Sequence, residues 1–366
     1  MTARTRIFIR FTGILLVLTG STGLYSKDWR KLVNEETRPL TDINRLVIEY
    51  GARDLVFVEG SGENLVIRDF MFRNNRDHYS VIQPFSGGEL RISRAEIYPS
   101  FFSWFTRTPK SEIYIPPAFQ GDFDIQLSSG NVKAESRIAT AGAVSMELRS
   151  GDARMRSLEG GTVSIVVRSG NLNIDDLRGD CAVELKSGNA RIKNMEGGTI
   201  SILSRSGNLD IDNARGDCTM ELRSGNIRMK NLEGGTVSIL LRSGNLDIDN
   251  AGGDCTVELR SGNITIGSMT GRGSYSTTSG NIKVRLKELS GNQSFDVGSG
   301  NITLRLPRGV SYNLDAAAKS GEIKIRDSDL EGFGSSGGII VKSFGENPVY
   351  TIRSRVKSGN FEIRAD

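Results

Sequence analysis

Hydrophobic and polar residues alternate along short segments through most of the chain. In the segment CTVELRSGNITI, Cys255, Val257 and Leu259 alternate with polar residues, and Ile264 and Ile266 resume the alternation after a Ser-Gly-Asn turn. A period of two is typical of β-strands with one buried face. The pattern therefore predicts an all-β protein whose short strands are separated by glycine turns.

The Ser-Gly pair recurs at a nearly constant interval. From residue 150 to residue 279 its steps are 18 or 19 residues, with the serine at Ser150, Ser169, Ser187, Ser206, Ser224, Ser243, Ser261 and Ser279. Helical repeats need roughly 33 or more residues per unit, so this step is too short for them. It suits one coil of a parallel β-solenoid, and parallel crossovers are nearly always right-handed. We predict a right-handed parallel β-solenoid (β-helix) with 18–19-residue rungs and irregular β caps at both ends.

Equivalent positions before each turn are apolar and predict columns of stacked side chains. The position six residues before the turn serine holds Val144, Val163, Cys181, Ile200, Cys218, Val237 and Cys255. The three cysteines therefore replace valine or isoleucine on alternate rungs, and successive cysteines lie two rungs apart, ~9.6 Å. A disulfide needs Cα atoms within about 7 Å. We expect three buried free thiols, and neither a disulfide nor a metal site.

Outward positions after each turn change sign from rung to rung. They read Arg154/Arg156, Asn173/Asp175, Arg191/Lys193, Asp210/Asp212, Arg228/Lys230 and Asp247/Asp249. Stacked like charges are unfavourable, whereas alternating signs place opposite charges next to each other. The near-identical segments RSGNLNIDDLRGDC, RSGNLDIDNARGDC and RSGNLDIDNAGGDC recur every 37 residues, which is two rungs. The duplicated unit is thus one acidic rung and one basic rung.

An asparagine follows most of the Ser-Gly pairs. The regular part of the row contains Asn171, Asn189, Asn208, Asn226, Asn245 and Asn263. Glycine supplies the positive φ that the corner needs, and stacked asparagine amides can bond to the amides above and below. We interpret the row as a structural asparagine ladder; the alternative is a ligand-binding row.

These features resemble a known bacterial family. The SGNI and SGNL turns, the run INRLVIEYGARDLVFVEGSGENLVIRD and the later segments GELRIS, SEIYIPP and FDIQLSSGNV are similar to the adhesin-like β-strand-repeat family, also called toastrack domains. The resemblance covers roughly residues 40–366. It implies an exported, envelope-associated β-solenoid with surface or envelope-stress roles, and it supplies no catalytic residues.

The first 26 residues have the pattern of a secretory signal peptide. Arg4, Arg6 and Arg10 accompany the apolar run FTGILLVLTG, which small residues follow. An uncleaved anchor is the alternative, but the run is short of the ~20 residues that a spanning helix needs. We therefore expect export to the periplasm or to the cell surface. Without this segment the chain has 44 basic and 43 acidic residues, a balance that argues against a general polyanion binder, and so against a nucleic-acid partner, but leaves room for local stripes of charge.

The chain ends differ from the regular middle. We predict an N-terminal β cap region over residues 27–120, a regular solenoid over 121–326, and irregular C-terminal rungs and a cap over 327–366. The loop at 98–110 carries Phe101, Phe102, Trp104 and Phe105. It either folds back over the cap or forms an exposed tip that contacts a membrane surface or a partner protein.

One outward column is basic on every rung. Arg149, Arg168, Lys186, Arg205, Arg223, Arg242 and Arg260 each stand immediately before a turn serine. Glu147, Glu184, Glu221 and Glu258 stand two residues back on alternate rungs, where Val166, Leu203 and Leu240 occupy the others. Either local pairing neutralises the column while the arginine stems cover apolar surface, or it is a stripe of ~30 Å for an anionic envelope polymer. We call these seven residues the basic stripe.

No catalytic motif is visible. The sequence shows no nucleophile elbow, phosphate loop or zinc-ligand spacing, and its single histidine, His78, lies in a polar stretch. We expect no enzyme activity and no cofactor. The predicted function is an adhesin-like scaffold that binds an envelope protein or an anionic surface polymer. The alternatives are a β-helix that binds or cleaves polysaccharide and a regulatory partner in the envelope stress response. The oligomeric state is not predicted.

Overall fold

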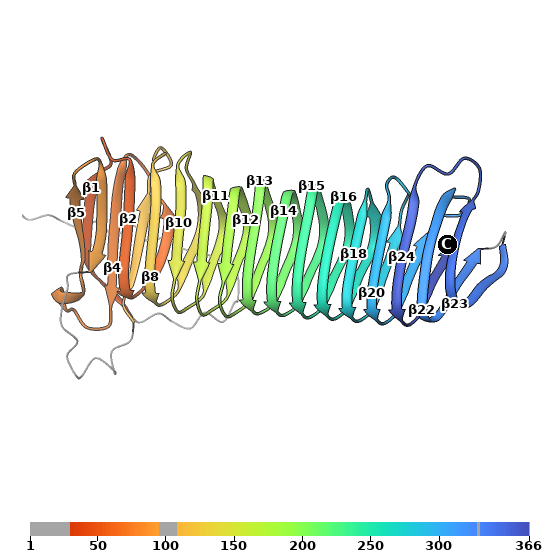
Figure 1. The fold of residues 1–366 in the computed structure, drawn as a ribbon. Helices are drawn as coiled ribbons and strands as arrows, with labels where there is room; N and C mark the ends of the chain where they lie inside the picture. The colour runs from red at the N-terminus through yellow and green to blue at the C-terminus, as the bar shows by residue number, and fades with distance from the viewer. Residues whose placement is uncertain (1–29, 95–107, 328–329, 366) are drawn as a thin grey trace, which may run out of the picture.

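The computed structural model describes residues 30–94, 108–327 and 330–365, which form an elongated rod of stacked β-strand coils (Figure 1). The strands all belong to one hydrogen-bonded sheet system that winds along the rod. The coils pair in parallel at steps of 18 or 19 residues, as in Ile200 beside Cys218 and Cys218 beside Val237. The predicted parallel β-solenoid is therefore confirmed.

The middle of the rod consists of regular coils. Its strands are β8 (Asp122–Ser129), β9 (Val132–Ala139), β10 (Ala143–Leu148), β11 (Ala153–Val167), β12 (Leu172–Leu185), β13 (Ala190–Ser206), β14 (Leu209–Ser224), β15 (Ile227–Ser243), β16 (Leu246–Ser261), β17 (Ile264–Thr270), β18 (Gly273–Ser279), β19 (Ile282–Leu286), β20 (Gln293–Ser299) and β21 (Ile302–Leu306). The first part of β16 pairs with β17 and the second part with β18. Each long strand thus contributes to two faces of the rod.

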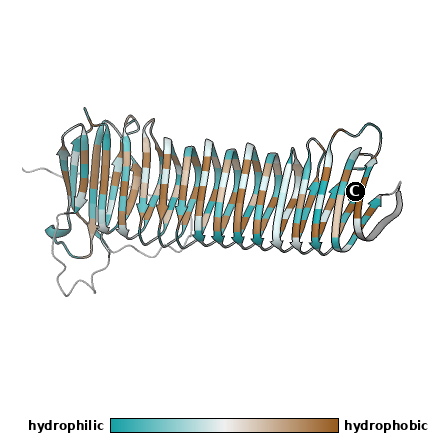
Figure 2. Cartoon of the chain, in the orientation of Figure 1, coloured by the Kyte–Doolittle hydropathy of each residue, from teal (hydrophilic) through white to brown (hydrophobic). Residues whose placement is uncertain are grey.

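The core consists of columns of identical or similar side chains. Val163, Cys181 and Ile200 are successive Cα partners, and all three are buried. Cys181, Cys218 and Cys255 are free and buried, as the column predicted. Burial raises the pKa of each thiol to about 12, so the sulfur stays protonated at neutral pH. Hydrophobic and hydrophilic positions alternate along the strands (Figure 2).

The corner glycines are required by two independent features. Gly225 has φ 133°, in the region that favours glycine, and the corner glycines of neighbouring coils have similar angles. A Cβ at Gly225 would lie 1.8 Å from the carbonyl oxygen of Gly207 in the preceding coil. The coils can stack at β-sheet distance here only because no side chain stands between them.

Ser204 interrupts an otherwise apolar column. Its Cα partners are Leu185 and Leu222, its exposed fraction is 0%, and its hydroxyl has no hydrogen-bond partner among the described residues. An unsatisfied buried hydroxyl costs roughly 1–3 kcal/mol. The equivalent residue one 37-residue unit later is Leu241.

We expect Ser204→Leu to stabilise the protein by about 2 kcal/mol, because it removes the unpaired hydroxyl and extends the apolar column. The reciprocal Leu241→Ser should destabilise by at least about 2 kcal/mol. Urea unfolding of both variants measures the two effects. A loss of stability in Ser204→Leu would mean that the column has no room for leucine at this level.

The N-terminal end places its coils out of chain order. Its elements are β1 (Lys31–Pro39), β2 (Arg45–Ala52), β3 (Asp54–Glu59), β4 (Asn64–Met71), the short 3₁₀ helix η1 (Arg76–His78), β5 (Ser80–Phe85), β6 (Glu89–Arg94) and β7 (Lys110–Ile115). The coil of β2 and β3 lies between that of β6 and β7 and that of β8 and β9. Beyond this coil the pairing is antiparallel: β5 pairs with β6, β4 pairs with β7, and β1 pairs with β4.

The C-terminal end is built in a similar way. Here the strands are β22 (Tyr312–Asp327), β23 (Leu330–Phe344), β24 (Thr351–Ser358) and β25 (Phe361–Ala365). The coil of β24 and β25 lies between that of β20 and β21 and the strand β22. The antiparallel partner β23 is the outer edge. The last two strands of the chain are thus an internal coil.

In the described ranges, no helix is long and apolar enough to cross a membrane. The predicted signal peptide over residues 1–26 lies outside those ranges.

Candidate functional site

The basic stripe lies along one face of the rod, at the residues that precede the Ser-Gly corners. The parallel register places Leu222 beside Leu241 and Ser224 beside Ser243, so Arg223 and Arg242 between them are neighbours on adjacent coils. The same register holds between β13 and β14 and between β15 and β16. Adjacent coils are ~4.8 Å apart, and the seven cations therefore extend over about 30 Å.

Among the described residues, local pairing occurs only at the N-terminal end of the stripe. Arg168 donates to Glu147 from Nη2 at 2.8 Å and from Nε at 3.0 Å, and Arg149 Nε lies 3.8 Å from the same carboxylate. For the other five stripe residues, no ion pair is found within the described part of the chain: Lys186, Arg205, Arg223, Arg242 and Arg260. The interpretation that glutamates neutralise the column thus holds for the first two cations alone.

The surface beside the stripe combines charge, hydroxyl groups and apolar side chains. Leu203 and Leu240 are each 39% exposed, an unusual exposure for leucine on a strand. They alternate with Glu184, Glu221 and Glu258 along one column. A parallel column one position further out holds serine or threonine at most levels, as at Ser201, Thr219 and Ser238. The face can therefore offer cations, hydrogen-bonding hydroxyls and aliphatic contacts at every second coil.

The asparagines after the Ser-Gly pairs are joined along the rod. Nδ2 of Asn208, Asn226, Asn245 and Asn263 each donates to Oδ1 of the asparagine one coil earlier at 3.2 Å, and Asn189 donates to Asn171 at 3.3 Å. Each of these oxygens also accepts the backbone N–H of the next asparagine at 2.9–3.3 Å. Each Oδ1 thus accepts two hydrogen bonds from the next coil. The row therefore links the corner of each coil to the corner of the next.

A second row of joined amides went unnoticed in the sequence. Asn194 donates to Asp176 at 2.8 Å, and Asn213, Asn231 and Asn250 continue the row at 2.8–2.9 Å. These residues recur at the same 18- or 19-residue step as the first row. The repeat spacing of these residues could therefore have predicted the row, but they stand next to the charged positions on which the sequence interpretation was based.

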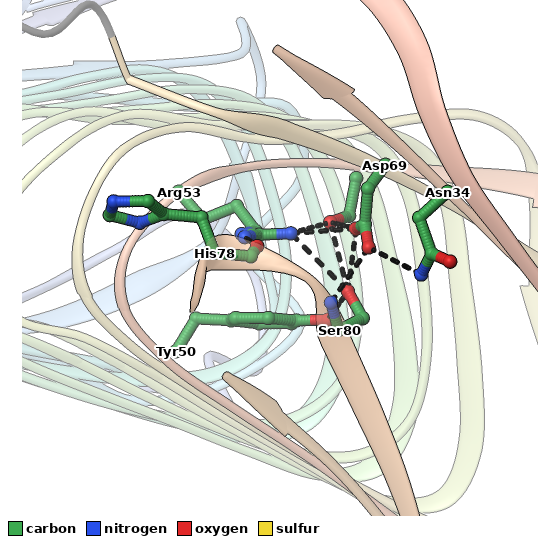
Figure 3. Close-up of polar contacts among 7 residues, drawn as sticks. Asn34, Tyr50, Arg53, Asp69, His78 and Ser80 are labelled. Atoms are coloured by element: carbon green, nitrogen blue, oxygen red, sulfur yellow. Dashed lines mark hydrogen bonds and ion pairs between the residues drawn. The ribbon is translucent and has the colours of Figure 1, made fainter. Parts of the chain in front are cut away.

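The N-terminal end contains a buried polar cluster that sequence reasoning did not find (Figure 3). Nη1 of Arg53 lies 2.7 Å from Oδ1 of Asp69, and the two side chains are 1% and 0% exposed. Oδ1 of Asp69 also accepts the hydroxyls of Ser80 and Ser111 at 2.6 Å, and Oδ2 accepts the Ser80 N–H at 2.7 Å. The cluster joins the segment between β2 and β3 to β4, β5 and β7.

Tyr50 and Asn34 complete this cluster. The Tyr50 hydroxyl lies 2.6 Å from the Ser80 hydroxyl, and burial raises the pKa of Tyr50 to about 12. Asn34 on β1 donates to Oδ2 of Asp69 at 3.1 Å. Since Arg53 and Asp69 are buried and their bonds join several end strands, the cluster fixes the arrangement of those strands.

Phe101, Phe102, Trp104 and Phe105 of the aromatic loop lie outside the described residues. Within the described ranges, no group of three or more His, Cys, Asp or Glu residues is arranged to hold a metal ion.

The fold defines a parallel β-solenoid protein with a long polar face. A family model described as Toastrack DUF4097 matches residues 43–222 and 214–364, so the chain belongs to the toastrack family. The resemblance that the SGN turns indicated is therefore confirmed.

Two crystal structures are similar to this chain over most of its length. One is a "putative cell adhesion protein" from Clostridium sporogenes, at 10% identity and a TM-score of 0.20, covering 91% of this chain and 99% of the other. The second is a "putative lipid binding protein" from Parabacteroides distasonis, at 14% identity and a TM-score of 0.22, covering 90% and 96%. At these scores the two names say nothing about the function of this chain. None of the curated proteins matches it.

Proposed function

We propose that this protein is a non-enzymatic, exported scaffold of the bacterial envelope that binds an anionic polymer lengthwise along the basic stripe. The observation that carries the proposal is the run of five consecutive cations, Lys186 to Arg260, without an ion-pair partner in the described chain. Stacked like charges repel, and an ordered polyanion would relieve that repulsion. Toastrack membership supports an adhesin-like role of this kind.

The neighbouring residues favour an acidic polysaccharide among the anionic polymers. Leu203 and Leu240 are two coils apart, ~9.6 Å, which is close to the length of a disaccharide unit. The carbon-rich face of a sugar ring can pack on such a leucine, while serine and threonine hydroxyls bond to sugar hydroxyls. The carboxylates of alternate sugars would then contact the arginines, which bind planar anions well.

The test replaces three stripe residues together. We expect the variant Arg205→Gln/Arg223→Gln/Arg242→Gln to bind polygalacturonate at least about ten-fold more weakly at low salt. Because each cation that contacts a polyanion releases counterions, the salt dependence of binding should also become shallower. Binding of the full chain to immobilised polygalacturonate, with neutral dextran as reference, measures both effects.

The control removes the same charge from ion-paired positions. Arg178→Gln/Arg215→Gln/Lys230→Gln changes three cations that contact Glu196, Glu233 and Asp212 on other faces. Equal losses in both triple variants would show a general charge effect and overturn the stripe. New reducing ends in the same incubation would instead show polysaccharide cleavage and overturn the non-enzymatic assignment.

A further inference from the structure

A second face of the rod follows the Ser-Gly-Asn corners, and its charges alternate from coil to coil. Lys230 Nζ lies 2.9 Å from Asp212, and Lys193 Nζ lies 2.7 Å from Asp175. Arg191 lies 3.5 Å from Asp210. Opposite charges on successive coils therefore form ion pairs along the rod, as the 37-residue charge pattern predicted.

The alternation is interrupted at one position. Asn173 occupies the place that Asp210 and Asp247 occupy in the two later copies of the unit. The register puts Asn173 between Arg154 on β11 and Arg191 on β13. A neutral residue thus separates two arginines where the repeat elsewhere supplies a carboxylate.

Two arginines at this level form no ion pair in the described chain. Within the described chain, neither Arg154 nor Arg156 forms an ion pair. The carboxylate on the preceding coil, Glu135, forms its ion pair with Lys133, and the hydrogen bond from Lys133 lowers the pKa of Glu135, with a smaller contribution from the charge of Arg154. Asp175 on the following coil is engaged by Lys193.

These side chains line a shallow groove of about 550 Å³. Its cations are Lys133, Arg154, Arg156, Arg191 and Lys193, against the two carboxylates Glu135 and Asp175. One 37-residue unit further along, Arg228 and Lys230 lie between coils that carry Asp210, Asp212, Asp247 and Asp249. The groove therefore carries a local excess of positive charge. The coil of Asp210 and Asp212 borders it at one end.

We infer that this groove binds a small molecule that carries two or more phosphate groups. Arg154 and Arg156 lie on one strand with side chains on the same face, ~6.8 Å apart, and Arg191 lies two coils from Arg154, ~9.6 Å. Separate anionic groups of one ligand can meet these cations. The guanidinium fork binds phosphate oxygens in pairs, and the volume suits a small ligand better than a polymer. This site lies across the corner from the basic stripe and does not depend on the function proposed for it.

The experiment restores the charge pattern of the repeat. Asn173→Asp introduces the residue that the equivalent coils already contain, so the fold should tolerate it. We expect calorimetric binding of inorganic tripolyphosphate to the full chain to weaken at least about ten-fold, with orthophosphate binding much more weakly than tripolyphosphate to the unchanged protein. Vesicles containing phosphatidylinositol phosphates, compared with soluble tripolyphosphate, distinguish a lipid headgroup from a free ligand.

The control is Thr265→Asp, which adds the same charge to the same column beside Asp247. It should leave tripolyphosphate binding within about two-fold, because the charge lies five coils from Asn173, ~24 Å, well beyond the screening length. Equal weakening by both substitutions, or no binding to the unchanged protein, would overturn the inference. The stripe variant should still bind tripolyphosphate at this groove, and Asn173→Asp should still bind polygalacturonate, so the two proposals fail separately.

Discussion

Gly225→Ala is expected to destabilise the protein by more than about 4 kcal/mol, which is exceptional for the addition of one methyl group. Two effects combine. The residue has φ 133°, where alanine is strained, and the new Cβ would lie 1.8 Å from the Gly207 carbonyl oxygen. Backbone atoms of two coils must separate to relieve the contact, which weakens the hydrogen bonds and apolar columns around this corner. Thermal unfolding and limited proteolysis measure the loss.

Gly62→Ala separates the two effects. Gly62 also has a positive φ, 111°, but a Cβ there meets no atom within 4 Å. The strain alone should cost roughly 1–2 kcal/mol. If the two variants lost the same stability, the close stacking of the corner glycines would not be what requires glycine at Gly225.

Asp69→Asn is expected to destabilise the N-terminal end by about 3–5 kcal/mol, because it leaves the buried charge of Arg53 without its counter-ion. Arg53 and Asp69 are 1% and 0% exposed, so water cannot replace the lost partner. The amide also cannot accept all the hydrogen bonds that the carboxylate accepts from Ser80, Ser111 and Asn34. Hydrogen exchange should show the loss first in β1 to β7, before the regular coils.

An exposed pair of the same length is the control. Arg68 Nε lies 2.7 Å from Glu35, with side chains 39% and 46% exposed. Glu35→Gln should therefore change stability by less than about 1 kcal/mol. A comparable loss in the two variants would show that the energy of the Arg53–Asp69 pair does not come from burial.

The candidate sites were visible in the sequence only in part. The basic stripe follows directly from the repeat, since one residue type precedes seven successive turns. The lack of ion-pair partners from Lys186 to Arg260 in the described chain did not, because Glu184 and Glu221 are near in sequence and only the side-chain geometry shows that they stay apart from these cations. The exception at Asn173 is visible in the repeat. That Arg154 and Arg156 form no ion pair in the described chain could not be predicted, because it depends on the contact between Lys133 and Glu135.

The sequence by itself determined the coil: its step of 18 or 19 residues, its inward columns and the place of the three cysteines within them. Those features are local, because a residue in a stacked coil meets its own equivalents at a constant spacing. Only the tertiary structure decided the ends, where β2–β3 and β24–β25 are inserted out of chain order and antiparallel strands form the edges. Alternating hydrophobicity is the same for a strand at any level of the stack. The level that a strand occupies depends on edge pairing and on buried contacts such as Arg53–Asp69, which join residues that no short repeat relates.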